Sequence, residues 1–238
     1  MLETLQTIGN LIEAFSARGL RKVTKEDTSS ISKVPFKLIS LRELYQYRLV
    51  DVSRAAYEQY EHGKYIPAFI LTRAVMETVA MFYVCYEKLS KTLNTGVIDT
   101  TDDFLMQALF GSRDGTGTVK HYNALTEVQH VGKRSKAFEE LYFSLCEFTH
   151  PNWAGVYLPY GDSREQGCLN LTSGVDAVMA EPIGTKPLLA SLMLFHELYQ
   201  DLIKSFLNLL GFVSRINSIQ NSYLIHLPAN PSLELDGS

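Results

Sequence analysis

The stretch from Tyr65 to Tyr86 (YIPAFILTRAVMETVAMFYVCY) is the most apolar part of the chain. It is long enough to cross a bilayer, but Arg73 and Glu77 would both lie near the middle of such a span. Each charge would cost about 2.5–3.5 kcal/mol at that depth. A helix that is apolar on nearly all sides otherwise lies at the centre of a protein core. We therefore expect a central core helix and no membrane span, with Pro67 in its first turn.

The overall composition is typical of a globular protein. Hydrophobic residues make up 46% and charged residues 20% of the 238 residues, enough apolar material for a sizeable core. The net charge of -4 gives no global attraction to nucleic acid or anionic membranes, and the chain carries no DNA-binding signature. No basic segment precedes the apolar residues of the N-terminus, so we expect a cytoplasmic protein without a signal peptide. The spacing of Cys85, Cys146 and Cys168 argues against a disulfide framework or a zinc cluster.

Apolar residues at helical spacing predict helices on both sides of the central stretch. The prediction comprises an N-terminal helix within residues 1–24, core helices within 36–151, and a long helix over 186–216 that starts at Thr185 and Pro187. The core segment includes helices at about 38–61, 103–110 and 119–130, and a further helix capped by Ser135.

A small β-hairpin is expected within residues 154–173. Its strands would be 155–159 (GVYLP) and 168–172 (CLNLT), on either side of the polar turn 161–167. The predicted fold class is mainly α: a helical bundle around a central apolar helix, with this hairpin before the long C-terminal helix. Residues 1–227 would form a single domain, and the Pro-rich segment 228–238 would be a disordered tail.

Two pairs of polar residues are candidates for a functional site. Arg73 and Glu77 share one helix face, and in so apolar a helix neither charge can remain unpaired. They would form either an internal ion pair or part of a polar pocket. Glu147 and His150 lie at i, i+3 in the run FEELYFSLCEFTHPNW. Pro151 disfavours the helical conformation for His150, which leaves the imidazole at the helix exit and more accessible.

A metal-binding bundle is an alternative interpretation. Glu127 and His130 repeat the Glu-x-x-His spacing of Glu147 and His150. Together with Glu77 and with Glu58 or Glu61, these pairs are similar to the ligand sets of di-metal carboxylate bundles. The two motifs lie only twenty positions apart with Gly132 between them, unlike the arrangement in those bundles. We therefore assign no metal ligand and no cofactor from the sequence.

A family resemblance rests on Gly63-x-Tyr65-x-x-Ala68, Leu71-x-Arg73-x-x-x-Glu77 and Leu145-Cys146-Glu147-x-x-His150-Pro151-Asn152. The pattern, over about residues 55–215, resembles bacterial helical proteins of unknown function. Their helical layout is similar to that of HEPN domains, which often act as metal-independent RNases in toxin and antiviral systems. HEPN catalysis uses an Arg followed four to six residues later by a His, but Ser144 and Leu145 stand in that place here.

Two hypotheses follow. The resemblance implies an RNA-acting or phage-defence protein in which Arg73 supplies the cation, His150 is the acid/base and Glu77 or Glu147 orients it. The alternative is a non-enzymatic interaction or structural module, a homodimer, in which the same residues form a buried network. In that case Trp153 would pack against the hairpin, and Glu147 or a backbone group would fix the His150 ring.

Overall fold

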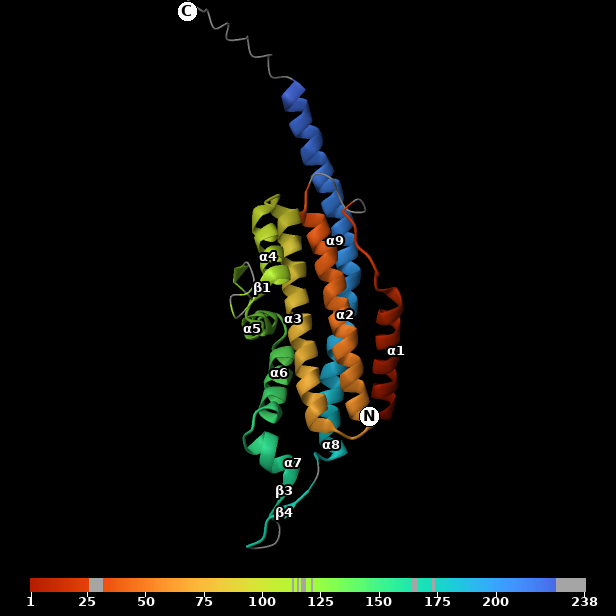
Figure 1. Ribbon diagram of the computed structural model, residues 1–238, viewed down its shortest axis with the longest axis vertical. Helices are drawn as coiled ribbons and strands as arrows, with labels where there is room; N and C mark the ends of the chain where they lie inside the picture. Colours follow the sequence, from red (N-terminus) through yellow and green to blue (C-terminus); the bar gives the residue numbers. More distant parts are fainter. Residues whose placement is uncertain are drawn as a thin grey trace, which may run out of the picture.

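The computed structural model of the chain describes residues 1–25, 32–112, 114, 116, 119–120, 122–163, 167–172 and 174–225. These residues form an elongated bundle with helix α3 (Tyr65–Thr95) in the middle (Figure 1). Five helices pack around α3: α2 (Val34–Glu61), α4 (Asp99–Phe110), α5 (Ala124–Gly132), α6 (Lys136–Thr149) and α9 (Lys186–Ile225). The predicted fold class is therefore confirmed, and the apolar stretch is the central helix.

Helix α3 continues beyond the apolar stretch to Thr95. Gly96 ends it in the left-handed conformation (φ +76°), and its N–H donates to the Thr92 carbonyl (2.8 Å). By length and composition alone, α3 and the segment Ala177–Arg215 could each cross a membrane. In α3, however, 61% of the most apolar window is buried against other helices, as in the core helix of a bundle.

The N-terminal half of the bundle follows the prediction closely. Helix α1 (Leu2–Arg18) lies along α2 and α9 and buries its apolar stripe, which includes Ile8, Ile12 and Phe15. Helix α2 starts at Val34, a few residues before the predicted start, because Pro35 fits the first helical turn, where no N–H is needed.

Helix boundaries differ from the prediction around residues 99–123. Helix α4 starts at Asp99, four residues before its predicted start, and Thr101 is buried with its hydroxyl against that of Thr92. Helix α5 starts only at Ala124, because the Asn123 side chain accepts a hydrogen bond from the Leu125 N–H (3.1 Å). The predicted helix over 119–123 is wrong: β2 (Val119–Lys120) pairs in parallel with β1 (Gly111–Ser112). Ser135 caps α6 as predicted.

The segment after α6 is helical where a strand was expected. A π-helical turn, η1 (Trp153–Tyr157), and α7 (Leu158–Tyr160) replace the predicted strand 155–159. The Asn152 side chain accepts a hydrogen bond from the Gly155 N–H (3.0 Å) and so starts the turn. A Cβ at Gly155 would lie 1.9 Å from the His150 carbonyl oxygen, so only glycine permits this close approach.

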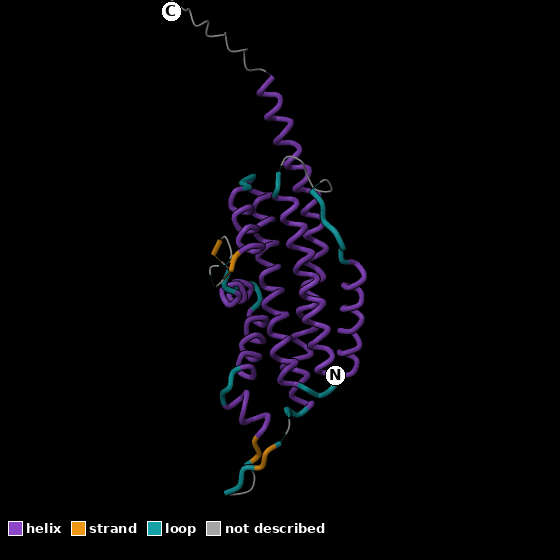
Figure 2. The backbone as a smooth tube through the Cα atoms, in the orientation of Figure 1, coloured by secondary structure: helices purple, strands orange, loops and turns teal. Residues whose placement is uncertain are grey.

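The hairpin itself is present but short. Strand β3 (Gly161–Asp162) pairs antiparallel with β4 (Asn170–Leu171) at the lower end of the molecule (Figure 2). Helix α8 (Ala177–Ala180) and the π-helical turn η2 (Glu181–Thr185), neither predicted, lead into α9. Helix α9 starts at Lys186 as predicted and continues to Ile225, beyond its predicted end at 216. The predicted tail 228–238 lies outside the described residues.

Candidate functional site

Arg73 and Glu77 are brought together with two residues of α6. The Arg73 Nε donates to Glu77 Oε1 (3.2 Å) and to the Tyr142 hydroxyl (3.3 Å), and Nη1 donates to Thr149 Oγ1 (3.1 Å). The Tyr142 hydroxyl donates to Glu77 Oε1 (2.8 Å). We call these four residues the polar clasp, because they join α3 to α6.

The electrostatics of the polar clasp keep its charges balanced. Burial raises the pKa of Tyr142, so its hydroxyl stays protonated. Burial acts against the Arg73 charge, but the hydrogen bond to Tyr142 and the nearby Glu77 outweigh it, and the pKa of Arg73 is raised. Burial also raises the pKa of the neighbouring Cys146 thiol, which disfavours the nucleophilic thiolate. The cluster is thus an ion pair bridged by a neutral phenol.

Glu147 and His150 do not join the polar clasp. Glu147 is exposed and accepts a hydrogen bond from the Asn152 amide (3.1 Å). His150 is exposed, with φ -87° and ψ 148°, outside the helical region as predicted. Among the described residues its ring makes no hydrogen bond or ion pair, so the expected fixation by Glu147 is not found. The four predicted site residues therefore divide into a connected pair and two exposed side chains at the end of α6.

Two polar groups of the clasp were not expected from the sequence. Neither Tyr142 nor Thr149 was among the predicted site residues. Their spacing of seven places both on one face of α6, two turns apart. This spacing could have indicated that the two side chains act together. It does not identify α3 as the helix that Tyr142 and Thr149 contact.

A buried ionic cluster elsewhere was also missed. Arg42 (6% exposed) and Glu43 (4% exposed) are paired in α2, with Arg42 Nη2 2.5 Å from Glu43 Oε1. The same carboxylate accepts from the Tyr199 hydroxyl of α9 (3.0 Å) and, through Oε2, from the backbone N–H of Leu20 (2.7 Å). Burial raises the pKa of Tyr199 to about 12. The cluster fixes the chain just after α1 to α2 and α9, which is a structural role.

The metal-binding alternative finds no donor set in the described part of the chain. No group of three or more His, Cys, Asp or Glu side chains there is arranged to hold a metal ion. His130 instead pairs with Glu87 (2.5 Å), and Glu127 is buried nearby. The two Glu-x-x-His motifs thus have separate surroundings.

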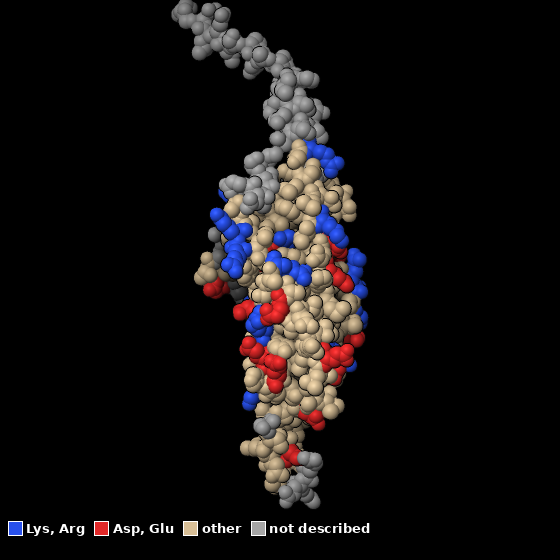
Figure 3. Space-filling view, turned by 90° about the vertical axis from the view of Figure 1, so that its right-hand side faces the viewer, with Lys and Arg blue, Asp and Glu red and all other residues tan. Residues whose placement is uncertain are grey.

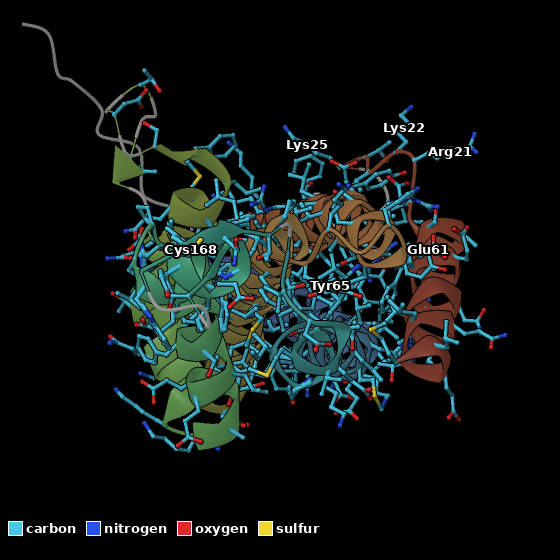
Figure 4. The ribbon with its side chains drawn as sticks, turned by 90° about the horizontal axis from the view of Figure 1, so that it is seen from below. Arg21, Lys22, Lys25, Glu61, Tyr65 and Cys168 are labelled. Atoms are coloured by element: carbon cyan, nitrogen blue, oxygen red, sulfur yellow. The ribbon has the colours of Figure 1, made fainter. Side chains whose placement is uncertain are left out.

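The structure contains a cavity that is separate from the expected polar pocket. A cavity of about 820 Å³ lies at the base of the bundle, between the starts of α1 and α3 and the end of α2. Its lining includes Tyr57, Glu61 and Tyr65 but none of the four predicted site residues. Figure 4, a view from below, shows Glu61 beside α1 and Tyr65 nearer the middle of the bundle.

Exposed apolar side chains gather at the lower end of the molecule. We call this set the apolar end: Trp153, Val156, Leu158, Tyr160, Leu169, Leu171, Val178 and Met179. Their exposed fractions run from 41% for Tyr160 to 83% for Leu171. Trp153, which was predicted to pack against the hairpin, is 65% exposed. Figure 3 shows this end largely free of charged side chains on the face in view.

The chain was compared with protein-family models, with curated proteins and with solved structures, and none of the three comparisons gave a match.

Proposed function

We propose that this chain is a cytoplasmic, non-catalytic interaction module that binds another protein through its apolar end. The observation that carries this proposal is the exposure of eight large apolar side chains at that end. The largest apolar patch of a monomeric soluble protein is roughly 300–600 Å² and is often functional. Grouped apolar exposure of this kind is typical of a surface that becomes covered by a partner.

The closed state of the polar clasp supports a structural role for Arg73 and Glu77. Arg73 Nε and Nη1 already have acceptors, and Glu77 Oε1 already accepts from Arg73 and Tyr142. A catalytic arginine must direct donors to the charge that develops on a substrate. A positioning network within the fold instead directs donors at acceptors of its own chain, as Arg73 Nε and Nη1 do.

Stability and activity measurements on the same variants test the proposal. Arg73→Ala and Glu77→Gln should each lower the melting temperature by about 2–8 °C, for a loss of about 1–2 kcal/mol in a chain of this size. Neither the wild-type protein nor the variants should degrade RNA. A variant that keeps its melting temperature but loses an RNA-degrading activity present in the wild type would contradict the proposal.

The fluorescence of Trp153 tests the surface itself. Trp153 is the only tryptophan in the chain, so emission reports directly on the apolar end. In dilute protein, acrylamide should quench this emission efficiently, because the side chain is 65% exposed. Emission that resists quenching under those conditions would mean that the chain covers its own apolar end.

An HEPN-like, RNA-acting function in phage defence is the second candidate. The observation that favours it is the place of the exposed His150 imidazole. His150 follows Thr149 in the sequence, and the Thr149 hydroxyl accepts a hydrogen bond from the Arg73 guanidinium. An acid/base group and a cation would then approach one phosphodiester from neighbouring positions. Wild type, His150→Ala and the control His62→Ala should be compared on RNA substrates. Loss of cleavage in His150→Ala alone supports this function, and equal rates or no cleavage in all three exclude it.

A further inference from the structure

The apolar end receives little cover from its own chain. The main packing partners of η1, α7, β3 and β4 are α6 and one another, so this segment projects below the bundle (Figure 1). After β4 the chain returns beside α7, where the Thr172 and Gly174 N–H groups donate to the carbonyls of Tyr160 (2.9 Å) and Pro159 (3.0 Å). A lone two-stranded hairpin is at best marginally stable in water. The segment therefore gains from any surface that covers it.

The exposed area matches what a stable protein dimer needs. Taking roughly 200 Å² for a large apolar residue, the exposed fractions of the eight side chains add up to about 900 Å². A standard protein–protein interface buries about 800 Å² on each partner. The summed exposure of the apolar end is therefore of the size that one side of such an interface buries.

Charge argues against an anionic lipid surface as the occupant. The described residues between 153 and 180 include Asp162 and Asp176 but no lysine or arginine, and Arg164 lies outside the described residues. Binding to anionic lipid relies on clusters of basic side chains. Asp176 is engaged in capping α8 through the Val178 N–H (2.9 Å), and Asp162 is not free either. An apolar surface with locally engaged acids suits a partner that is equally apolar and uncharged.

We propose that the occupant of the apolar end is a second copy of this chain, in a two-fold symmetric dimer. The inference rests on the proposed function and names the partner of the same surface. A symmetric interface places the same patch on both partners, so an apolar, nearly uncharged surface is complementary to itself. Because Trp153 follows His150 by only three residues, such a dimer also brings the ends of two α6 helices toward one another.

Sedimentation velocity over about 1–100 µM protein is the first experiment, since interfaces of standard size bind in the micromolar range or more tightly. We expect a monomer–dimer equilibrium, with Trp153 emission moving to shorter wavelength and losing acrylamide quenching as the dimer forms. Leu171→Asp and Val178→Asp, at positions 83% and 76% exposed, should weaken the dimer about 30-fold or more. A carboxylate introduced on one copy is introduced on its partner too, so each dimer would bury two.

Matched controls carry the same substitution at exposed apolar positions outside the apolar end. Leu44→Asp (59% exposed, α2) and Leu207→Asp (61% exposed, α9) should leave the dimer unchanged. Circular dichroism of each variant checks that it folds. The inference would be overturned if the control substitutions broke the dimer and Leu171→Asp left it intact. The contact between the two copies would then lie outside the apolar end.

The remaining outcomes separate the inference from the proposed function. If the chain is monomeric at all concentrations while acrylamide reaches Trp153, the second-copy inference is overturned and the interaction function stands with another partner. If acrylamide fails to reach Trp153 in the dilute monomer, both are overturned. A monomer that binds phosphatidylcholine vesicles, or only those with added phosphatidylserine, would replace the second copy by a lipid surface.

Discussion

Replacing Glu43 by Gln would remove the negative charge that joins α2 to α9 and to the chain just after α1. The Glu43 carboxylate pairs with Arg42, accepts from the Tyr199 hydroxyl and accepts from the Leu20 N–H, and it is only 4% exposed. Glutamine has nearly the same shape, so packing changes little. The Arg42 guanidinium, itself 6% exposed, would then be left without a counter-charge.

The cost follows from that uncompensated charge. Breaking a buried ion pair by removing one partner costs about 3–5 kcal/mol. Because an amide oxygen still accepts hydrogen bonds, we expect the lower end, about 3 kcal/mol. For a chain of this size this corresponds to a drop of about 6–12 °C in the melting temperature. Combining Glu43→Gln with Arg42→Met should cost less than Glu43→Gln alone, since no buried guanidinium remains.

Urea unfolding followed by circular dichroism measures these differences. Glu13→Gln is the matched control, because the Glu13–Arg54 pair (2.6 Å) also joins α1 to α2 but is 67% and 42% exposed. A surface pair of this kind contributes about 0–1 kcal/mol. If Glu43→Gln costs no more than Glu13→Gln, or if adding Arg42→Met increases its cost, the buried-charge reasoning is refuted.

Three further predictions concern other described residues. Tyr142→Phe removes the hydroxyl that bridges Arg73 and Glu77 and should cost about 1.5–3 kcal/mol in urea unfolding, whereas Tyr47→Phe, at a position 51% exposed, should cost almost nothing. Gly155→Ala would set a Cβ against the His150 carbonyl and should cost about 1–3 kcal/mol, with faster amide exchange confined to η1 and its neighbours; unchanged exchange would contradict the close approach. Burial raises the pKa of Glu127 above 4.5, so its ionisation destabilises the fold, and stability should fall as pH rises from 4.5 through the folded-state pKa. The stability gained by Glu127→Gln should therefore grow over that range, and a gain independent of pH would refute the assignment.

The features that the sequence predicted correctly depend on local patterns. The central helix follows from one continuous apolar stretch, and the start of α6 follows from Ser135 two positions before the apolar run. The pairing of Arg73 with Glu77 follows from i, i+4 spacing within one helix. Each of these signals lies within a few residues of the feature that it predicts.

The features that were missed depend on contacts between distant parts of the chain. Tyr142 and Thr149 lie 69 and 76 positions from Arg73, and only the docking of α6 on α3 brings them together. Arg42 and Glu43 are adjacent in sequence, and neighbours at i, i+1 do not normally face one another on a helix, so their pairing gave no pattern.

The segment 153–160 was misassigned because its residues favour a strand while its starting geometry favours a helix. Val156, Tyr157 and Leu158 are β-prone, but the Asn152 cap and the glycine contact with the His150 carbonyl begin a helical turn. Strand propensity spans only about 1 kcal/mol and is easily overridden by context. A cap and a close backbone approach together exceed that preference.

The polar clasp makes its hydrogen bonds inside the fold, whereas the apolar end exposes its side chains. This contrast favours the interaction function over the RNA-acting function. Arg73, Glu77 and Tyr142 direct hydrogen-bonding groups at one another and at Thr149, so the polar clasp joins α3 to α6 within the fold. Three residues after His150, the chain enters the apolar end, whose side chains find little cover within the described chain. Uncovered apolar area drives association in proportion to the surface removed from water, whereas hydrogen bonds already made inside the fold contribute nothing new on binding. The corner between α6 and η1 is therefore better suited to holding an apolar surface in a fixed direction than to transferring a proton.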